Sequence, residues 1–150
     1  MELNGVAHIS LTVNRLDVCA EFYDALLCEQ FGFTKVNASD VMHYYIGGRT
    51  AVAIGQAAAE HLDQSFEDRR IGLHHVCFRA KSRGDIDRLY EEFLVPRGVK
   101  IYYPPREGPW APGYYSVSFF DPDGIRLEVN HVPGKGVLAP GVRFDPAGDY

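Results

Sequence analysis

The sequence predicts an α+β protein built from two tandem βαβββ modules, and three observations support this fold class. A histidine opens a strand-like run in each half: His8 in the first half and His75, 67 residues later, in the second. Phe22 and Leu89 repeat the same spacing inside amphipathic segments. Each half also combines one helical pattern with several short β-prone stretches. A duplicated supersecondary unit is therefore expected.

In the first half, residues 6–13 alternate apolar and polar side chains, which predicts a strand. Asn14 is a candidate helix cap with Asp17 three residues later, and apolar residues recur at helical spacing over 16–27. Three short β-prone stretches follow, separated by Asn-Ala-Ser-Asp and Gly-Gly turn signals; they cover 31–36, 41–46 and 50–54.

The same order repeats in the second half. A strand is expected at 73–80, and then a helix from about Ser82 to Leu94 that ends before a proline and a glycine. Three further strands are expected near 99–103, 114–120 and 125–130. The segment between the first two of these, 104–113, is rich enough in Pro and Gly to predict an irregular loop, and it carries Trp110, the only tryptophan.

A single domain over residues 1–150 is expected, because a chain of this length can bury a core without disulfides. Within it, the patterns place module one at about 4–56, a polar connector at 57–71 and module two at about 72–132. The tail, 133–150, is expected to run over the surface without regular structure.

Composition excludes several classes of protein. The formal net charge of -5 and the lack of a Lys/Arg cluster argue against nucleic-acid binding. No apolar run approaches the roughly 20 residues that span a bilayer, so no membrane partner is expected. The N-terminal residues lack a secretory signal, which predicts a cytoplasmic protein. Three cysteines without C-x-x-C spacing fit reduced thiols.

Strand parity divides the polar and apolar side chains of three strands between two faces. The apolar face of each strand suits packing under a helix, and the opposite face is polar. The polar sets are His8, Ser10 and Thr12; His75, Cys77 and Arg79; and Arg126, Glu128 and Asn130. Each set contains one histidine or glutamate able to bind a metal, namely His8, His75 and Glu128.

The runs His8-Ile9-Ser10-Leu11 and His75-Val76-Cys77-Phe78, with the terminal Asp121–Val129 segment, resemble the vicinal oxygen chelate superfamily. This superfamily includes glyoxalase I, fosfomycin-resistance enzymes, extradiol dioxygenases, epimerases and bleomycin-resistance proteins. The resemblance covers about residues 4–132. Its most specific part is the Asp-Pro-Asp-Gly turn followed by the strand that carries Glu128.

The resemblance implies an open eight-stranded barrel-like sheet around a central cleft that holds one divalent metal. It implies ligands at His8, His75 and Glu128. The family's fourth ligand position falls on the last strand of module one, where Val52 and Ala53 cannot bind a metal, and this departure weakens a glyoxalase I assignment. Two His and one Glu leave open coordination positions, and zinc, nickel, manganese and iron(II) all tolerate this set.

His43 and Glu128 are the candidate catalytic residues. His43 shares a strand face with Tyr45 and is a candidate acid/base group, or a group that supports the metal ligands. Glu128 alone is also compatible with an ordinary solvent-facing position. His74 has the opposite parity to His75, which indicates a structural role.

Candidate substrate contacts come from an aromatic group and an arginine. Trp110, Tyr114 and Tyr115 could form an aromatic wall over the pocket, or they could pack against the C-terminal tail. Arg126 shares the polar face with Glu128 and could bind an anionic substrate. A structural ion pair with a carboxylate is the alternative for Arg126.

The leading hypothesis is a metal-dependent enzyme acting on a small-molecule substrate that chelates the metal through vicinal oxygens. Lyase, isomerase or transferase chemistry ranks above dioxygenase chemistry, because extradiol members of the family usually have twice as many modules. The alternative is a non-catalytic protein of the bleomycin-resistance type that sequesters its ligand, and a protein that shares only the fold is a third possibility. A homodimer is expected by analogy with the family.

Overall fold

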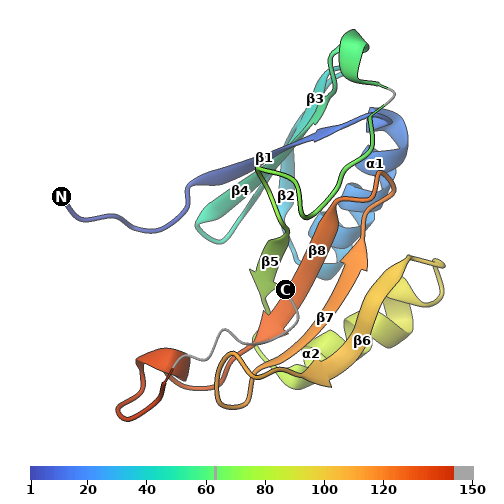
Figure 1. Cartoon of the computed structure of the whole chain (residues 1–150). Coiled ribbons are helices and arrows are strands. Elements are labelled where there is room, and N and C mark those ends of the chain that lie inside the picture. Colours follow the sequence, from blue (N-terminus) through green and yellow to red (C-terminus); the bar gives the residue numbers. More distant parts are fainter. Residues whose placement is uncertain (63, 144–150) are drawn as a thin grey trace. The chain divides into compact units, whose positions relative to one another are not determined.

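The structure is a computed structural model, and it describes residues 1–62 and 64–143. The fold class is the predicted one: α+β, with two βαβββ modules whose strands form two four-stranded mixed sheets (Figure 1). Among the described residues, no strand of one sheet pairs with a strand of the other.

Two compact units make up the chain, Met1–Phe66 and Glu67–Tyr150, and their boundary falls inside the predicted connector. Residue 63 of that connector and residues 144–150 of the predicted tail lie outside the described residues. The expectation of a single domain stays a prediction.

The first unit has strand order β1-β4-β3-β2, with β1 parallel to β4 and the other pairs antiparallel. Its strands are β1 (His8–Val13), β2 (Thr34–Ala38), β3 (Met42–Gly47) and β4 (Thr50–Gln56). Helix α1 (Leu16–Tyr23) continues as the π-helix η1 (Asp24–Gln30), and a 3₁₀ turn η2 (Ala59–His61) follows β4. Leu11, Leu26 and Ile54 are buried in this core.

Helix α1 begins differently from the prediction. Its N-terminal cap residue is Arg15, whose side chain makes no capping hydrogen bond. The side chain of Gln56 in β4 makes the hydrogen bonds at this helix end. Its Oε1 accepts from the Leu16 N–H at 3.4 Å, and its Nε2 donates to the Asn14 carbonyl at 2.8 Å. Asn14 donates its side-chain amide to the Gln64 carbonyl at 2.6 Å. A distant strand therefore satisfies a helix end that local sequence would have assigned to Asn14.

The second unit repeats this topology with strand order β5-β8-β7-β6, and β5 is parallel to β8. Its strands are β5 (Val76–Arg79), β6 (Ile101–Glu107), β7 (Tyr115–Phe120) and β8 (Arg126–His131). Helix α2 (Arg83–Arg88) continues as the π-helix η3 (Leu89–Leu94). Ser82 caps α2 by accepting from the Asp85 N–H at 3.2 Å, so this helix starts where the sequence predicts.

Two segments expected to be irregular contain regular structure. The tail includes a 3₁₀ turn, η4 (Gly136–Leu138). The predicted loop 104–113 is shorter than expected, because β6 runs on through Pro104 and Pro105 to Glu107. The prolines are tolerated because β6 is an edge strand whose register shifts between Tyr103 and Arg106, so the missing N–H groups break no regular ladder.

The two faces of the second sheet differ in chemistry. Helix α2 lies against β7 and β8, and the buried core on this side includes Ile86, Phe93 and Phe119. The polar side chains buried in the same unit are Ser116, Ser118, Asp121, Arg126 and Glu128. Buried charged residues are uncommon unless paired, so those in β8 mark a candidate site. No helix in the described residues is long and apolar enough to cross a membrane.

Candidate functional site

His75 and Glu128 come together on the polar face of the second sheet. His75 immediately precedes β5, and Glu128 lies on the neighbouring strand β8, opposite Cys77. His75 Nε2 is 3.2 Å from Glu128 Oε2. Glu128 is only 4% exposed, whereas His75 is partly exposed. Two of the three predicted metal ligands are therefore adjacent.

Glu128 is held as a carboxylate by its neighbours. The Tyr114 hydroxyl donates to Glu128 Oε1 at 2.6 Å. Burial on its own would raise the pKa of Glu128, but hydrogen bonds from His75, Tyr114 and Ser116 outweigh it, and the pKa is lowered. The site thus presents a buried, negatively charged oxygen pair.

Neutral polar groups surround this carboxylate. The Tyr103 and Ser116 hydroxyls are 3.0 Å apart, and burial is the largest cause that raises the pKa of Tyr103 to about 12. Cys77 is exposed as a residue, but desolvation of its sulfur and the charge of Glu128 raise the pKa of its thiol. At neutral pH these groups act as uncharged hydrogen-bonding partners.

The first unit lacks the carboxylate at the equivalent position. Ser10 and Cys77 correspond by the 67-residue repeat, and their partners on the adjacent strand are Ala53 and Glu128. Ala53 therefore occupies in the first sheet the place that Glu128 occupies in the second. His8 begins β1 with an exposed side chain. This register agrees with the expectation that module one offers no fourth ligand.

The spacing of His75 and Glu128 fits two ligands of one divalent ion. A gap of 3.2 Å between His75 Nε2 and Glu128 Oε2 is close to that of two donors sharing one ion at roughly 2.1 Å. Within the described residues of either unit, no three His, Cys, Asp or Glu side chains gather into a metal-binding group. The set of His8, His75 and Glu128 stays a prediction, because it draws its donors from both units.

His43 lies on the opposite face of the first sheet from His8. It pairs with Ile54 of β4, whose side chain is fully buried. The Tyr45 hydroxyl is 3.5 Å from His43 Nδ1 and donates to Asp24 of η1 at 2.9 Å. These contacts lie on the side of the sheet that carries η1. The catalytic role of His43 stays a prediction, and this placement lends it no support.

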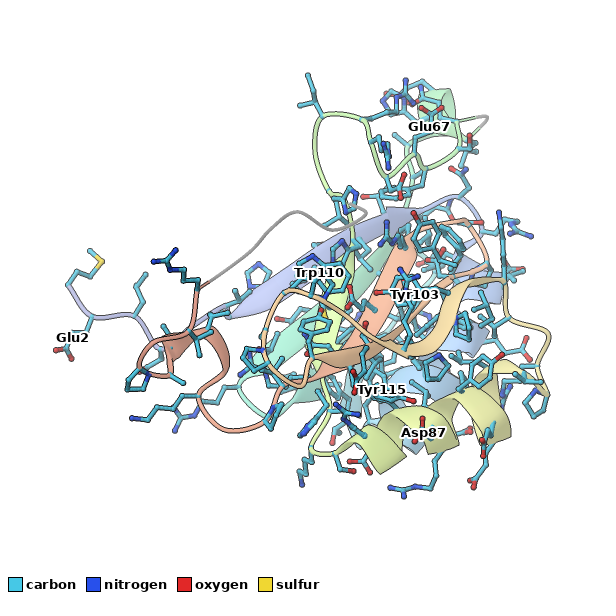
Figure 2. The ribbon with its side chains drawn as sticks, turned by 60° about the horizontal axis from the view of Figure 1, so that its bottom comes forward. Glu2, Glu67, Asp87, Tyr103, Trp110 and Tyr115 are labelled. Carbon is cyan, nitrogen blue, oxygen red and sulfur yellow. The ribbon has the colours of Figure 1, made fainter. Side chains whose placement is uncertain are left out.

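Tyr115 also points toward a helix. Its hydroxyl donates to Asp87 of α2 at 2.7 Å, and Figure 2 shows the two residues close to one another. The Arg83 Cζ atom lies over the Tyr115 ring, 5.0 Å from the ring centroid. Tyr114 is the tyrosine that reaches Glu128. Parity could have found this, because Tyr115 alternates in step with the apolar Val117, whereas Tyr114 alternates in step with Ser116 and Ser118.

Trp110 packs beside the site through Tyr114. The two rings form an edge-to-face pair with centroids 4.9 Å apart. Two members of the predicted aromatic wall, Trp110 and Tyr114, are thus together, and Tyr114 joins them to Glu128. Contact between Trp110 and a substrate stays a prediction.

Gly108 provides the space that the Trp110 ring occupies. A Cβ atom at position 108 would overlap the Trp110 ring. Gly108→Ala is expected to displace the indole from Tyr114 and to shift the fluorescence of this sole tryptophan. Gly84→Ala is the control, because a Cβ there meets only ordinary contacts, the nearest at 3.7 Å. Identical emission spectra for wild type and Gly108→Ala would contradict the prediction.

Arg126 is engaged in a structural ion pair. Its Nη1 is 3.1 Å from Asp68 Oδ2, and its Nε donates to Ser118 Oγ at 3.2 Å. The guanidinium also lies 3.9 Å over the Tyr102 ring, and Arg126 is only 3% exposed. The ion-pair alternative is present in the structure, and contact with an anionic substrate stays a prediction.

Comparison with known proteins gives related sequences and folds. A Bacillus subtilis (strain 168) protein, the uncharacterized YqjT, is 29% identical over 124 residues, which cover 81% of this chain and 94% of YqjT. A crystal structure of a Bacillus halodurans protein provisionally named a glyoxalase is 28% identical with a TM-score of 0.77, covering 86% of this chain and 96% of that one. The Mesorhizobium loti fosfomycin resistance protein FosX shares the fold, with 24% identity and a TM-score of 0.61 over 87% of this chain and 94% of its own.

The family assignment rests on most of the chain. The model of the Glyoxalase/Bleomycin resistance protein/Dioxygenase superfamily matches residues 5–129, which span both βαβββ modules. The duplicated topology agrees with this match. The chain belongs to the Glyoxalase/Bleomycin resistance protein/Dioxygenase superfamily.

Proposed function

We propose that this protein is a divalent-metal-dependent enzyme of the glyoxalase and dioxygenase type, acting on a small molecule with vicinal oxygens. Lyase or isomerase chemistry is favoured. The observation that carries the proposal is the pair formed by His75 and the buried carboxylate of Glu128, whose facing atoms are 3.2 Å apart. Such a carboxylate is costly to bury unless a cation or hydrogen bonds compensate its charge.

His8, His75 and Glu128 are the proposed metal ligands. His8 is included because it holds in module one the position that His75 holds in module two. Zinc, nickel, manganese and iron(II) fit this donor set. When bound, the ion would act as a Lewis acid on the substrate oxygens, an effect worth several kcal/mol. Three protein ligands leave room for a chelating substrate.

In this proposal, Tyr114 and Tyr103 have different roles. Tyr114 holds Glu128 by donating to its Oε1. Tyr103 keeps its proton at neutral pH, and its hydroxyl and that of Ser116 form a hydrogen-bonded pair beside Glu128 that would support a substrate oxygen on which negative charge develops. We further propose that the protein acts in the cytoplasm as a homodimer.

Metal analysis tests the proposal. Purified wild type is expected to bind one divalent ion per chain, and His8→Ala and His75→Ala are expected to lose it because each lacks a ligand. His61→Ala is the matched control, because His61 is an exposed histidine in η2 outside the proposed site.

Two outcomes would count against the metalloenzyme. Equal metal content in wild type and His75→Ala would show that the ion binds elsewhere. No bound metal in any variant, even after dialysis against zinc, manganese and nickel, would favour the alternative of a non-catalytic ligand-binding protein. The Trp110–Tyr114 pair would then supply a stacking surface for the ligand.

A further inference from the structure

Tyr114 connects the buried carboxylate to the loop that precedes β7. Each oxygen of Glu128 has its own partner: Oε1 accepts from the Tyr114 hydroxyl at 2.6 Å, and Oε2 faces His75 Nε2 at 3.2 Å. On its other side, the Tyr114 ring contacts Trp110. A carboxylate held at one oxygen loses rotational freedom, so the Tyr114 contact, together with the hydrogen bond from Ser116, restricts the direction of the second oxygen.

The scaffold holds the backbone of Tyr114 in place. The Gly108 N–H donates to the Tyr114 carbonyl at 3.1 Å, and the Tyr114 N–H donates to the Ala111 carbonyl at 3.0 Å. Arg83 Nη1 of α2 is 2.8 Å from Glu107 Oε1, and Arg83 Nη2 donates to the Gly113 carbonyl at 3.4 Å. Arg83 thereby connects both ends of the loop 108–113 to the helix, and the backbone that carries the Tyr114 side chain is held in place.

We propose that Tyr114 is a positioning residue that aims Glu128 Oε2 toward His75 and couples Glu128 to Trp110. The part of this proposal that concerns metal rests on the proposed function. Outer partners of metal ligands orient the donor atoms, and their loss usually costs roughly 10–100-fold in metal affinity. The coupling to Trp110 rests only on contacts within the second unit and holds with or without metal.

Tyr114→Phe and Tyr115→Phe form a matched pair for the test. Both variants remove a single hydroxyl that donates to a carboxylate, at 2.6 Å to Glu128 and at 2.7 Å to Asp87. In a cobalt(II) titration of the apoprotein, followed by visible absorption, Tyr114→Phe is expected to weaken affinity about 10–100-fold and to change the absorption spectrum of the complex. Tyr115→Phe is expected to match wild type.

A second measurement uses metal-free protein and the fluorescence of Trp110. In Tyr114→Phe the ring at position 114 no longer has a hydrogen bond to Glu128, so its contact with Trp110 should loosen. Quenching of the Trp110 fluorescence by acrylamide should then be stronger than in wild type and in Tyr115→Phe. Thermal denaturation of each variant checks that the fold is retained.

The outcomes separate this proposal from the proposed function. If wild type binds no cobalt(II) but Tyr114→Phe exposes Trp110, the metal function fails and the coupling stands. If wild type binds the ion with the same affinity and spectrum as Tyr114→Phe, the positioning role is overturned and the metal function stands. Equal quenching in all three proteins would overturn the coupling.

Discussion

Replacing Glu128 with glutamine is expected to weaken divalent-metal binding by more than roughly 100-fold, beyond the usual cost of losing an outer partner. The substitution keeps the shape of the side chain but replaces an anionic oxygen donor with a neutral amide. Because Glu128 is buried and fixed at both oxygens, no neighbouring water can easily substitute for it. Isothermal titration with zinc measures the effect.

The same variant has a predicted pH signature without metal. The pKa of Glu128 is lowered in the folded protein, so its contribution to the free energy of unfolding is present above the unfolded value of about 4.3 and is lost as pH falls through the folded value. Glu128→Gln should therefore melt below wild type at neutral pH, and the difference should shrink on acidification below about pH 4.

Glu91→Gln is the control for both measurements, because it removes the charge of an exposed glutamate in η3. It should leave metal affinity and the melting temperature close to wild type at each pH. Wild-type metal affinity in Glu128→Gln would remove Glu128 from the ligand set. A melting difference that does not depend on pH would mean that the charge of Glu128 contributes nothing to stability.

Removing Asp68 is expected to produce the second large effect, a loss of about 3 kcal/mol in the free energy of unfolding. Asp68→Ala leaves the Arg126 guanidinium buried without its carboxylate partner. The Arg126 side chain is 4% exposed, and its other contacts include the Ser118 hydroxyl and the Tyr102 ring. Neither neutralises its charge. Urea denaturation measures the change.

Glu67→Ala is a neighbouring control for Asp68→Ala. Glu67 pairs with Arg70 at 3.7 Å on the surface, where both side chains are more than half exposed, so its removal should cost no more than about 0.5 kcal/mol. If Asp68→Ala were as stable as Glu67→Ala, the ion pair would not be structural. Arg126 would then be a better candidate for binding an anionic substrate.

The parts of the fold that depend on alternation were predictable from sequence. Period-two patterns predict β1 and β8, and strand parity places His75 and Glu128 on one polar face, as the structure does. Ser82 predicted the start of α2 because capping is local chemistry. These features follow from neighbours in sequence or from the strand repeat.

Other features depend on contacts that sequence spacing does not reveal. Gln56 reaches the start of α1 from a strand 40 residues away along the chain. Tyr103 comes from edge strand β6, whose register shift hides its alternation, and meets Ser116 of β7. A strand face shared with Tyr45 makes His43 a candidate, and the long loop that carries Trp110 makes Tyr115 one, but the contacts of both residues lie toward helices.

The two prolines of β6 bear on how copies of this protein can associate. An edge strand normally offers unpaired N–H groups to which a strand of another molecule can add. Pro104 and Pro105 lack that donor and lie where the register shifts, so the outer margin of the second sheet resists such extension. Self-association through this margin, including aggregation by strand addition, is therefore disfavoured, and a dimer would have to form through side-chain surfaces or another edge.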